Sequence, residues 1–371
     1  MLESLNLAMF AMPKTRQPKQ LQPMNKEISK ILINWYRVNK RDLPWRNTRD
    51  PYRIWISEII LQQTRVAQGE SYYRRFVDRF PDVQTLASAS EEEVLKYWQG
   101  LGYYTRARNL HAAAKTVCEE YQGLFPTDYK YVRALKGIGD YTAAAIVSFT
   151  TGQPYPVVDG NVFRVLARLF AVDTPIDTGK GKKEFTDLAR ELMDTEQTGI
   201  HNQAIMEFGA LQCVPQSPDC TVCPLQDRCK AYQFGDVTLF PIKKNKTKTR
   251  DRFFHYFDIR KGDKTYLYRR AGKDIWTGLF EFPMIETAGD VSPEALMTSD
   301  EFCKLFGESK LSIHPFSKRY KHVLSHQVLY ADFYRVEVGD DFTLPEPYRE
   351  IRSDEISEYA VPQLMNRYLL E

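Results

Sequence analysis

The chain has 371 residues, of which 43% are hydrophobic and 27% are charged, and its formal net charge is +3. This length predicts two or three domains with enough apolar material for hydrophobic cores. The near-neutral charge by itself says nothing about nucleic acid. The longest uncharged stretch, 141–158, contains glycine and proline, so it is not expected to span a membrane.

The first 25 residues lack the basic start of a secretory signal, and Glu3 lies within them. We therefore expect 1–25 to be a flexible tail. Residues 26–232 are expected to form an all-helical domain, because apolar residues recur there at helical spacing and strand-like alternation is nearly absent. In "EISKILINWYRVN", for example, Ile28, Ile31, Trp35 and Tyr36 share one face.

The stretch "LKGIGDYTAAAI" at 135–146 predicts a tight turn that opens a helix at Asp140 or Tyr141. Gly137 and Gly139 bracket one apolar residue in this turn. The stretch "QGLGYYTRA" at 99–107 weakly repeats the same arrangement. Helix–turn–helix units often end on glycine, so a plain interhelical turn remains an alternative to a functional loop.

Four of the six cysteines lie within seventeen residues, separated by six, two and five residues: Cys213, Cys220, Cys223 and Cys229. Cys118 and Cys303 are isolated, which favours one metal site in a reducing compartment over a disulfide framework. Zinc sites usually contain two close cysteine pairs, and this segment contains one. Four thiolates in so short a span favour a four-iron, four-sulfur (4Fe–4S) cluster, with zinc as the alternative.

Residues 233–250 end in the basic run "KKNKTKTR" and are predicted to be a linker. Beyond them the pattern changes. The stretches 252–260, 264–270, 278–286 and 326–338 are β-branched and aromatic, whereas 294–307 and 361–370 are helical in pattern. The sequence therefore predicts a separate α+β domain over 251–371.

The cysteine spacing, together with the Gly-apolar-Gly turn upstream of it, resembles the endonuclease III class of helix-hairpin-helix DNA glycosylases. The resemblance implies that backbone N–H groups at Gly137 and Gly139 bind a DNA phosphate at a helix N-terminus. Lyase members of this class have a lysine, which forms a Schiff base, where this chain has Tyr141. The resemblance therefore implies a monofunctional enzyme that uses water and leaves an abasic site.

Two carboxylates fit glycosidic chemistry. Asp159 precedes a helical stretch and could be a plain N-cap, but a helix N-terminus also keeps a carboxylate ionised. Such an anion would stabilise an oxocarbenium-like transition state. Glu58 has Ile54, Leu61 and Gln62 one helical turn away, and apolar surroundings raise the pKa of a carboxyl, as a general acid requires.

The motifs "WISEIILQQT", "LPWR" at 43–46 and "VDGNV" at 158–162 are similar to those of MutY-type adenine DNA glycosylases, and the resemblance covers roughly 27–371. It implies that Glu58 protonates adenine at N7 and that Asp159 stabilises the sugar cation. Tyr141 and Asn161 would orient Asp159 and its surroundings, and Arg46 would help to bind the extruded adenine.

The same resemblance implies that Gln63 and Tyr103 wedge into the base stack opposite the extruded base, with further DNA contacts at Gln62 and Leu101. Core packing is the alternative role for Tyr103. The implied partner is double-stranded DNA with adenine opposite 8-oxoguanine or guanine, bound by a monomer without a membrane. If the source is bacterial, we expect a cytoplasmic protein associated with the nucleoid through its substrate.

The C-terminal half resembles the MutT-like domain of the same family, which has the Nudix fold. The nearest string to the metal-binding Nudix box is "REIRSD" at 349–354, and Arg335 and Asp341 occupy its required glycine and glutamate positions. We therefore expect this domain to bind rather than to hydrolyse. Where the family reads 8-oxoguanine with a Phe-Ser-His turn, this chain has leucine followed by Ser325 and His326.

Three other functions remain open at this point. A bifunctional endonuclease III-like glycosylase/lyase would cleave the strand without alkali, and Tyr141 argues against it. A non-catalytic iron–sulfur DNA-binding or redox-sensing module would not need Glu58 or Asp159. A nucleotide pyrophosphatase is disfavoured by the missing metal box.

Overall fold

The computed structural model describes residues 21–245, 249–316 and 318–371. The chain divides into two compact units, and each is discontinuous in sequence. The first contains residues up to 41 and 152–244, and the second contains 42–151 and 245–371. This division does not follow the expected boundary between 232 and 251, because the chain leaves the first unit at 41 and returns to it at 152. Of the expected tail, 1–20 lies outside the described residues, and 21–25 already belongs to a helix.

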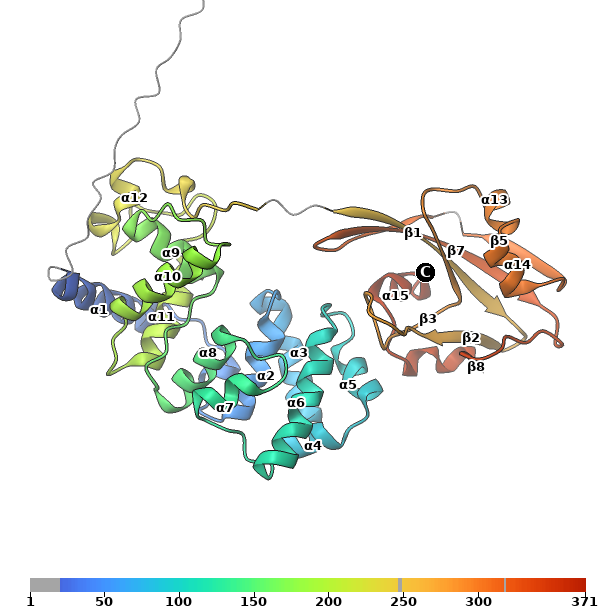
Figure 1. Ribbon diagram of the computed structural model, residues 1–371, viewed down its shortest axis with the longest axis horizontal. Coiled ribbons are helices and arrows are strands. Elements are labelled where there is room, and N and C mark those ends of the chain that lie inside the picture. Colours follow the sequence, from blue (N-terminus) through green and yellow to red (C-terminus); the bar gives the residue numbers. More distant parts are fainter. Residues whose placement is uncertain (1–20, 246–248, 317) are drawn as a thin grey trace, which may run out of the picture. The chain divides into compact units, whose positions relative to one another are not determined.

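The first unit is helical (Figure 1). Its elements are α1 (Leu21–Asn39), α9 (Gly160–Phe170), α10 (Gly179–Leu192), α11 (Thr198–Leu211), η2 (Gln226–Arg228), α12 (Lys230–Gln233) and η3 (Val237–Leu239). Their apolar faces form one core, to which α1 contributes Ile28, Leu32 and Ile33. Trp35 packs edge-on against Phe208 of α11, at 5.0 Å between ring centroids.

Part of the expected linker 233–250 belongs to this core. Phe240 is 6% exposed, and the buried guanidinium of Arg168 donates hydrogen bonds to the carbonyls of Val237 and Phe240. Residues 237–240 therefore pack on the first unit, and the basic run of the expected linker follows them along the chain.

The helical part of the second unit confirms the all-α prediction. It contains η1 (Pro44–Arg46), α2 (Pro51–Leu61), α3 (Val66–Arg79), α4 (Val83–Ser88), α5 (Glu91–Trp98), α6 (Thr105–Tyr121), α7 (Tyr129–Ala134) and α8 (Asp140–Thr151). Four of these helices have an N-cap residue whose side chain accepts a hydrogen bond from a backbone amide of the first turn. These N-caps are Asp50, Asp82, Ser90 and Asp128.

Residues 250–371 fold into mixed sheets with short helices, as predicted. One sheet has the strand order β4 (Met284–Thr287), β1 (Arg250–Arg260), β7 (Gln327–Val338), β5 (Leu311–Pro315), and β6 (Tyr320–Val323) also pairs with β7. The other has the order β3 (Phe280–Glu281), β2 (Lys264–Arg269), β8 (Tyr348–Arg352). The long strands β1 and β7 run parallel (Figure 1); β1 is buried over most of its length, whereas buried and exposed residues alternate along much of β7.

The expected helical stretch 294–307 forms two helices, α13 (Pro293–Met297) and α14 (Asp300–Phe306), because Ser299 caps the second one. Helix α15 (Gln363–Leu369) confirms the last helical pattern, and η4 (Ser353–Glu358) lies upstream of it. The sequence patterns missed the short strands β5, β6 and β8. Within the described ranges, no helix combines the length and the apolar character that crossing a membrane requires.

Candidate nucleic-acid interface and catalytic groups

The turn between α7 and α8 has the geometry that its glycines predict. Gly137 adopts φ +81°, and a Cβ there would lie 2.7 Å from the Cβ of Asn109. Arg133 braces the turn by donating to the carbonyl of Ile138 at 2.9 Å and to Asp140 Oδ1 at 2.6 Å. Within the described ranges, the backbone amides of Gly137 and Gly139 have no hydrogen-bond partner. Two open amides beside the N-terminus of α8 form a site that an anion can bind.

Helix α2 carries Glu58, which is 7% exposed, so the sequence-based expectation of a buried carboxyl is confirmed. The loop that follows α2 carries both candidate glutamines. Gln62 donates from Nε2 to Thr142 Oγ1 of α8 at 3.2 Å, which joins this loop to the hairpin helix. Gln63 is exposed and adopts φ +56°, in the left-handed region.

The loop 99–104 contains two tyrosines, one buried in the core and one exposed at the surface. Tyr104 is 5% exposed, whereas Tyr103 is 50% exposed with φ +49°. Core packing is therefore not the role of Tyr103, and its hydroxyl lies 2.5 Å from Ser325 Oγ. The Leu101 side chain is 7% exposed and belongs to the core, and the expected DNA contact at Leu101 stays a prediction.

A surface pocket lies between these two loops and the glycine turn. It is lined by residues of α2, of the two loops, of α6 and of the turn: Ile59, Gln62, Tyr103, Thr105, Arg106, Asn109, Leu110, Lys136 and Gly137. All of these belong to the second unit. The pocket thus brings together three sequence-predicted DNA contacts, Gln62, Tyr103 and Gly137, and Gln63 follows Gln62 along the chain. Tyr141 lies at the second position of α8, and Arg46 ends η1, both half-buried.

In the first unit, Asp159 is the N-cap of α9, as the sequence predicts. Its Oδ1 accepts from the backbone N–H of Val162 at 2.8 Å, and its Oδ2 accepts from Asn161 Nδ2 at 2.9 Å. Arg164 donates in turn to Asn161 Oδ1 at 2.8 Å and to the carbonyl of Cys213 at 2.7 Å. A continuous chain of hydrogen bonds therefore connects the carboxylate to the backbone of the first cysteine.

A close helix contact holds Asn161 in this chain. A Cβ on Gly209 of α11 would lie 2.8 Å from the Cβ of Asn161 and 2.9 Å from its carbonyl oxygen, so α9 and α11 approach closely only because residue 209 is glycine. Arg164 also donates to the carbonyl of Gly209 at 2.6 Å.

Two effects compete at the Asp159 carboxyl. Burial raises its pKa above the usual range, while the hydrogen bonds from Val162 and Asn161 and the charge of Arg164 lower the pKa. Burial is the larger effect. The sequence-based expectation that the helix N-terminus decides the ionisation of Asp159 is therefore incomplete, since burial opposes it.

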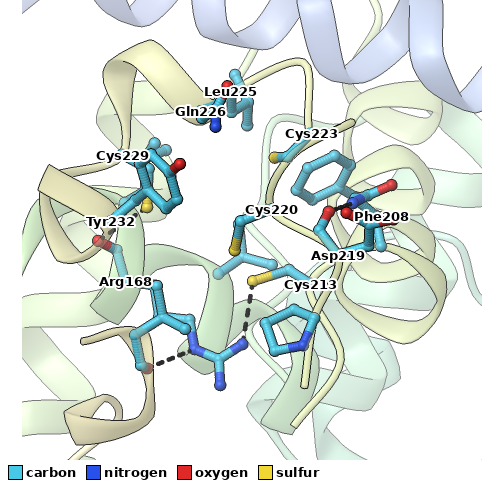
Figure 2. A pocket seen from close by; sticks show the side chains of 15 residues that line it. Arg168, Phe208, Cys213, Asp219, Cys220, Cys223, Leu225, Gln226, Cys229 and Tyr232 are labelled. Carbon is cyan, nitrogen blue, oxygen red and sulfur yellow. Dashed lines mark hydrogen bonds between the residues drawn. The ribbon is translucent and has the colours of Figure 1, made fainter. Parts of the chain in front are cut away.

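The four clustered cysteines line one cavity in the first unit, together with Arg168 and Phe208 (Figure 2). Arg168 is 2% exposed and donates from Nη1 to Cys213 Sγ at 3.4 Å, and to the carbonyls of Val214 and Pro215. Burial raises the pKa of the Cys223 thiol to about 11 and raises those of Cys220 and Cys229.

The donor set fits a polynuclear iron–sulfur group. All four thiols line the same cavity in the described part of the chain. Such a group takes each thiolate at a different iron, so four cysteines around one cavity can hold it.

In the C-terminal part, the expected lesion reader is the tip of the hairpin between β6 and β7. The Leu324 N–H donates to the carbonyl of Gln327 at 2.8 Å, which closes the turn, and Ser325 and His326 are exposed. The nearest string to a Nudix box lies on β8, where the Glu350 carboxylate accepts hydrogen bonds from Lys261, Lys264 and Tyr266.

The glycine turn between α7 and α8, followed along the chain by a mixed α+β domain, is the arrangement of one class of proteins. This class is the helix-hairpin-helix base excision repair proteins that carry a Nudix-type domain. The family model for "HhH-GPD superfamily base excision DNA repair protein" matches residues 56–191, and that for "NUDIX domain" matches 255–371. An adenine DNA glycosylase of Buchnera aphidicola subsp. Schizaphis graminum is 36% identical over 260 residues, which are 70% of this chain and 75% of that protein. The chain therefore belongs to the adenine DNA glycosylase family.

Other relatives support the same family assignment. The adenine DNA glycosylase of Buchnera aphidicola subsp. Baizongia pistaciae is 34% identical over 304 residues, 81% of this chain and 83% of that protein. The human adenine DNA glycosylase is 44% identical over 211 residues, 54% of this chain and 39% of that protein. Among solved structures, a thermostable thymine-DNA glycosylase matches with a TM-score of 0.54 at 28% identity. The match covers 58% of this chain and 99% of that glycosylase chain.

Sequence reasoning missed the arginines that organise these groups: Arg106, Arg164 and Arg168, which are 9%, 9% and 2% exposed. A signal was present in "TRARNL" and "NVFRVLARLF", where arginines occur among apolar residues of a helical pattern. Buried arginines need several acceptors, so such positions indicate a network rather than a solvated face.

Proposed function

We propose that the protein removes adenine from double-stranded DNA in which it is mispaired with 8-oxoguanine or guanine, by hydrolysis of the N-glycosidic bond. The proposal rests on two carboxyl groups that are each described within their own unit: Glu58, which is buried on α2, and Asp159, which Asn161 and the N-terminus of α9 hold in place. Two carboxyl groups in different environments divide acid and cation-stabilising roles in glycosidic chemistry.

Binding begins at the phosphates. The open amides of Gly137 and Gly139 take one phosphate of the strand, while Gln63 and Tyr103, both exposed and carried by adjacent loops, enter the base stack. Extrusion of the base costs a few kcal/mol and costs least at a mispair, which supplies part of the selectivity. Arg46 then helps to bind the extruded adenine, while Tyr141 and Asn161 orient Asp159 and its surroundings.

Glu58 gives its proton to adenine N7, and the bonding electrons of the glycosidic bond leave with the base. The Asp159 carboxylate stabilises the positive charge that develops on the sugar. Water adds to the sugar carbon, its proton leaves to a carboxylate or to solvent, and an abasic site remains. Tyr141 has no amine, so this chain offers no Schiff base at that position and the strand stays intact.

The four cysteines are assigned to a 4Fe–4S cluster held by Cys213, Cys220, Cys223 and Cys229. When bound, the cluster ties the segment 213–229 into one structure and can exchange electrons. Arg168 neutralises part of the thiolate charge at Cys213. We expect about four irons per chain by metal analysis and broad absorption near 400 nm. Stoichiometric zinc in a colourless, active protein would contradict this assignment.

Lesion reading is assigned to the β6–β7 turn. The N7–H of 8-oxoguanine, which guanine lacks, can donate to Ser325 Oγ, while His326 holds the turn or faces the backbone. The exposed position of Ser325, and its contact with the candidate intercalator Tyr103, support this assignment.

The test measures free adenine released from four matched duplexes that differ only at one pair: A:8-oxoguanine, A:G, A:T and T:8-oxoguanine. We expect release from the first two only. Release of thymine, or adenine release from A:T at the same rate, would exclude the proposal. The endonuclease III-like alternative instead predicts removal of damaged pyrimidines, so a duplex with an oxidised pyrimidine is the negative control.

A further inference from the structure

Arg106 is a buried cation that joins the two loops assigned above to base-stack insertion. It lies in the first turn of α6 and is 9% exposed. Burial lowers the pKa of its guanidinium to about 10, so it stays charged at neutral pH. A buried charge is retained only where several acceptors compensate it, and here the acceptors come from two separate loops.

The first set of acceptors is the C-terminal end of α2. Nη1 donates to the carbonyls of Ile59 and Ile60, at 2.9 Å each, and to the carbonyl of Gln62. Because the last carbonyls of a helix lack partners within the helix, a cation there satisfies them and is also favoured by the helix dipole. Arg106 thus fixes the end of α2 immediately before Gln63.

The second set lies on the loop between α5 and α6. Nη2 donates to the carbonyl of Gly102 at 3.1 Å and to that of Leu101 at 3.4 Å. The guanidinium also lies 5.3 Å from the ring centroid of Trp98 and 5.5 Å from that of Tyr103. Arg106 thus fixes the backbone immediately before Tyr103.

Both residues that follow these anchored carbonyls have unfavourable backbone conformations. Gln63 has φ +56° and Tyr103 has φ +49°, in the left-handed region that side chains other than glycine rarely adopt. Such conformations persist only where the surrounding structure over-determines them. Arg106 supplies that constraint to both loops from one planar group.

We propose that Arg106 is a positioning residue that holds Gln63 and Tyr103 in their insertion geometry and makes the two loops act as one wedge. The inference rests on the proposed function of these two side chains. Lysine cannot replace arginine in this role, because one ammonium on a flexible stem cannot bond both loops in a fixed plane.

The first measurement is amide hydrogen exchange on the full-length protein without DNA, which does not depend on any activity. In the wild type, the amides of 62–64 and 101–103 should exchange slowly for loops that are partly exposed. Arg106→Lys and Arg106→Gln should both speed exchange in these two segments together, and leave the rest of α6 unchanged. Arg74→Lys, which alters an exposed ion pair with Glu70, is the matched control.

The second measurement separates positioning from general support of the fold. Single-turnover excision is compared on adenine opposite 8-oxoguanine and on adenine opposite an abasic site, where no partner base has to be displaced. We expect Arg106→Lys to slow the first reaction about 10-fold or more and the second by no more than about 3-fold, since misplacement of a positioning group has effects of this size.

Equal losses on both duplexes, or no loss on either, would overturn the inference, and so would fast exchange of both loops in the wild type. Faster amide exchange in only one of the two loops of the variants would also overturn the inference, since the two loops would then not be held together. If the wild type releases no adenine from any duplex, the proposed function fails, whereas the exchange experiment still decides whether Arg106 joins the loops.

Discussion

At the residue scale, the catalytic proposal depends on how the protein treats two carboxyl groups differently. Glu58, the proposed proton donor, is buried on α2. Asp159 receives hydrogen bonds from Val162 and Asn161, which favour the ionised form, although burial still raises its pKa. The hydrogen bonds to Asp159 therefore oppose the effect of burial on the group that the proposed mechanism requires as an anion.

Glu58→Gln should leave DNA binding nearly unchanged and slow single-turnover excision of adenine at least about 100-fold, because glutamine keeps the size of the side chain but has no acidic proton. The rate is followed on the A:8-oxoguanine duplex with enzyme in excess. Glu70→Gln, on the exposed face of α3, is the control and should behave as the wild type. Near-normal excision by Glu58→Gln would remove this residue from the mechanism.

Asn161→Ala should shift the acidic limb of the excision profile to higher pH. Asn161 donates to Asp159 Oδ2 and so lowers the pKa of this carboxyl. Without that bond the pKa rises further, and protonation removes the catalytic anion at a higher pH. The neighbouring charge of Arg164 acts in the same direction as Asn161 and remains in the variant. The measurement is the excision rate against pH; an unchanged or lower midpoint contradicts the prediction.

At the element scale, the glycine turn shows how local conformation leaves open the backbone amides that we propose to bind a phosphate. The turn between α7 and α8 passes close to the side chain of Asn109. This close approach is possible only because Gly137 has no Cβ and adopts φ +81°. Gly139 differs, since it has open space around its Cβ position and no positive φ. The two glycines of one motif are therefore required for different reasons.

Gly137→Ala should destabilise the protein by about 1–2 kcal/mol through the left-handed conformation alone, and by more if Asn109 cannot move aside. Gly139→Ala should cost clearly less, because nothing lies within 4 Å of the added Cβ. Denaturant unfolding of both variants measures the difference. Equal losses of unfolding free energy would mean that the turn is not held as described.

The sequence was a good guide to the elements that have strong periodicity. It predicted the all-helical pattern, the helix start at Asp140 and the N-cap position of Asp159, because each depends on a local propensity. It missed β5, β6 and β8, which are short strands stabilised by pairing with distant segments. It also missed Arg106, whose role depends on loops that are brought to it by folding.

At the scale of the whole molecule, the β6–β7 turn is the part that we propose to read the second base of the mispair. Ser325 and Tyr103 belong to distant parts of the sequence but to the same compact unit, and their hydroxyls form a hydrogen bond. The residues that we propose for lesion discrimination and for base-stack insertion are therefore in direct contact, and bound DNA would have to replace this hydrogen bond with its own.

Ser325→Ala should reduce the ratio of excision rates on A:8-oxoguanine and A:G duplexes, measured at fixed salt because phosphate contacts make affinity salt-dependent. The loss of one hydrogen bond of about 0.5–1.5 kcal/mol corresponds to a decrease of roughly 2- to 13-fold. Ser312→Ala, an exposed serine on β5, is the control. A Ser325→Ala enzyme with the wild-type ratio would show that this turn does not read the lesion.

The most direct test of the central claim uses one duplex with a single A:8-oxoguanine pair, labelled on the adenine strand. After incubation with the full-length protein, half of each sample is treated with hot alkali before the strands are separated. Hydrolysis by water predicts cleavage at the adenine position only after alkali, with equivalent free adenine released. Strand cleavage without alkali, or a trapped covalent protein–DNA adduct after borohydride, would contradict the account and restore the lyase mechanism.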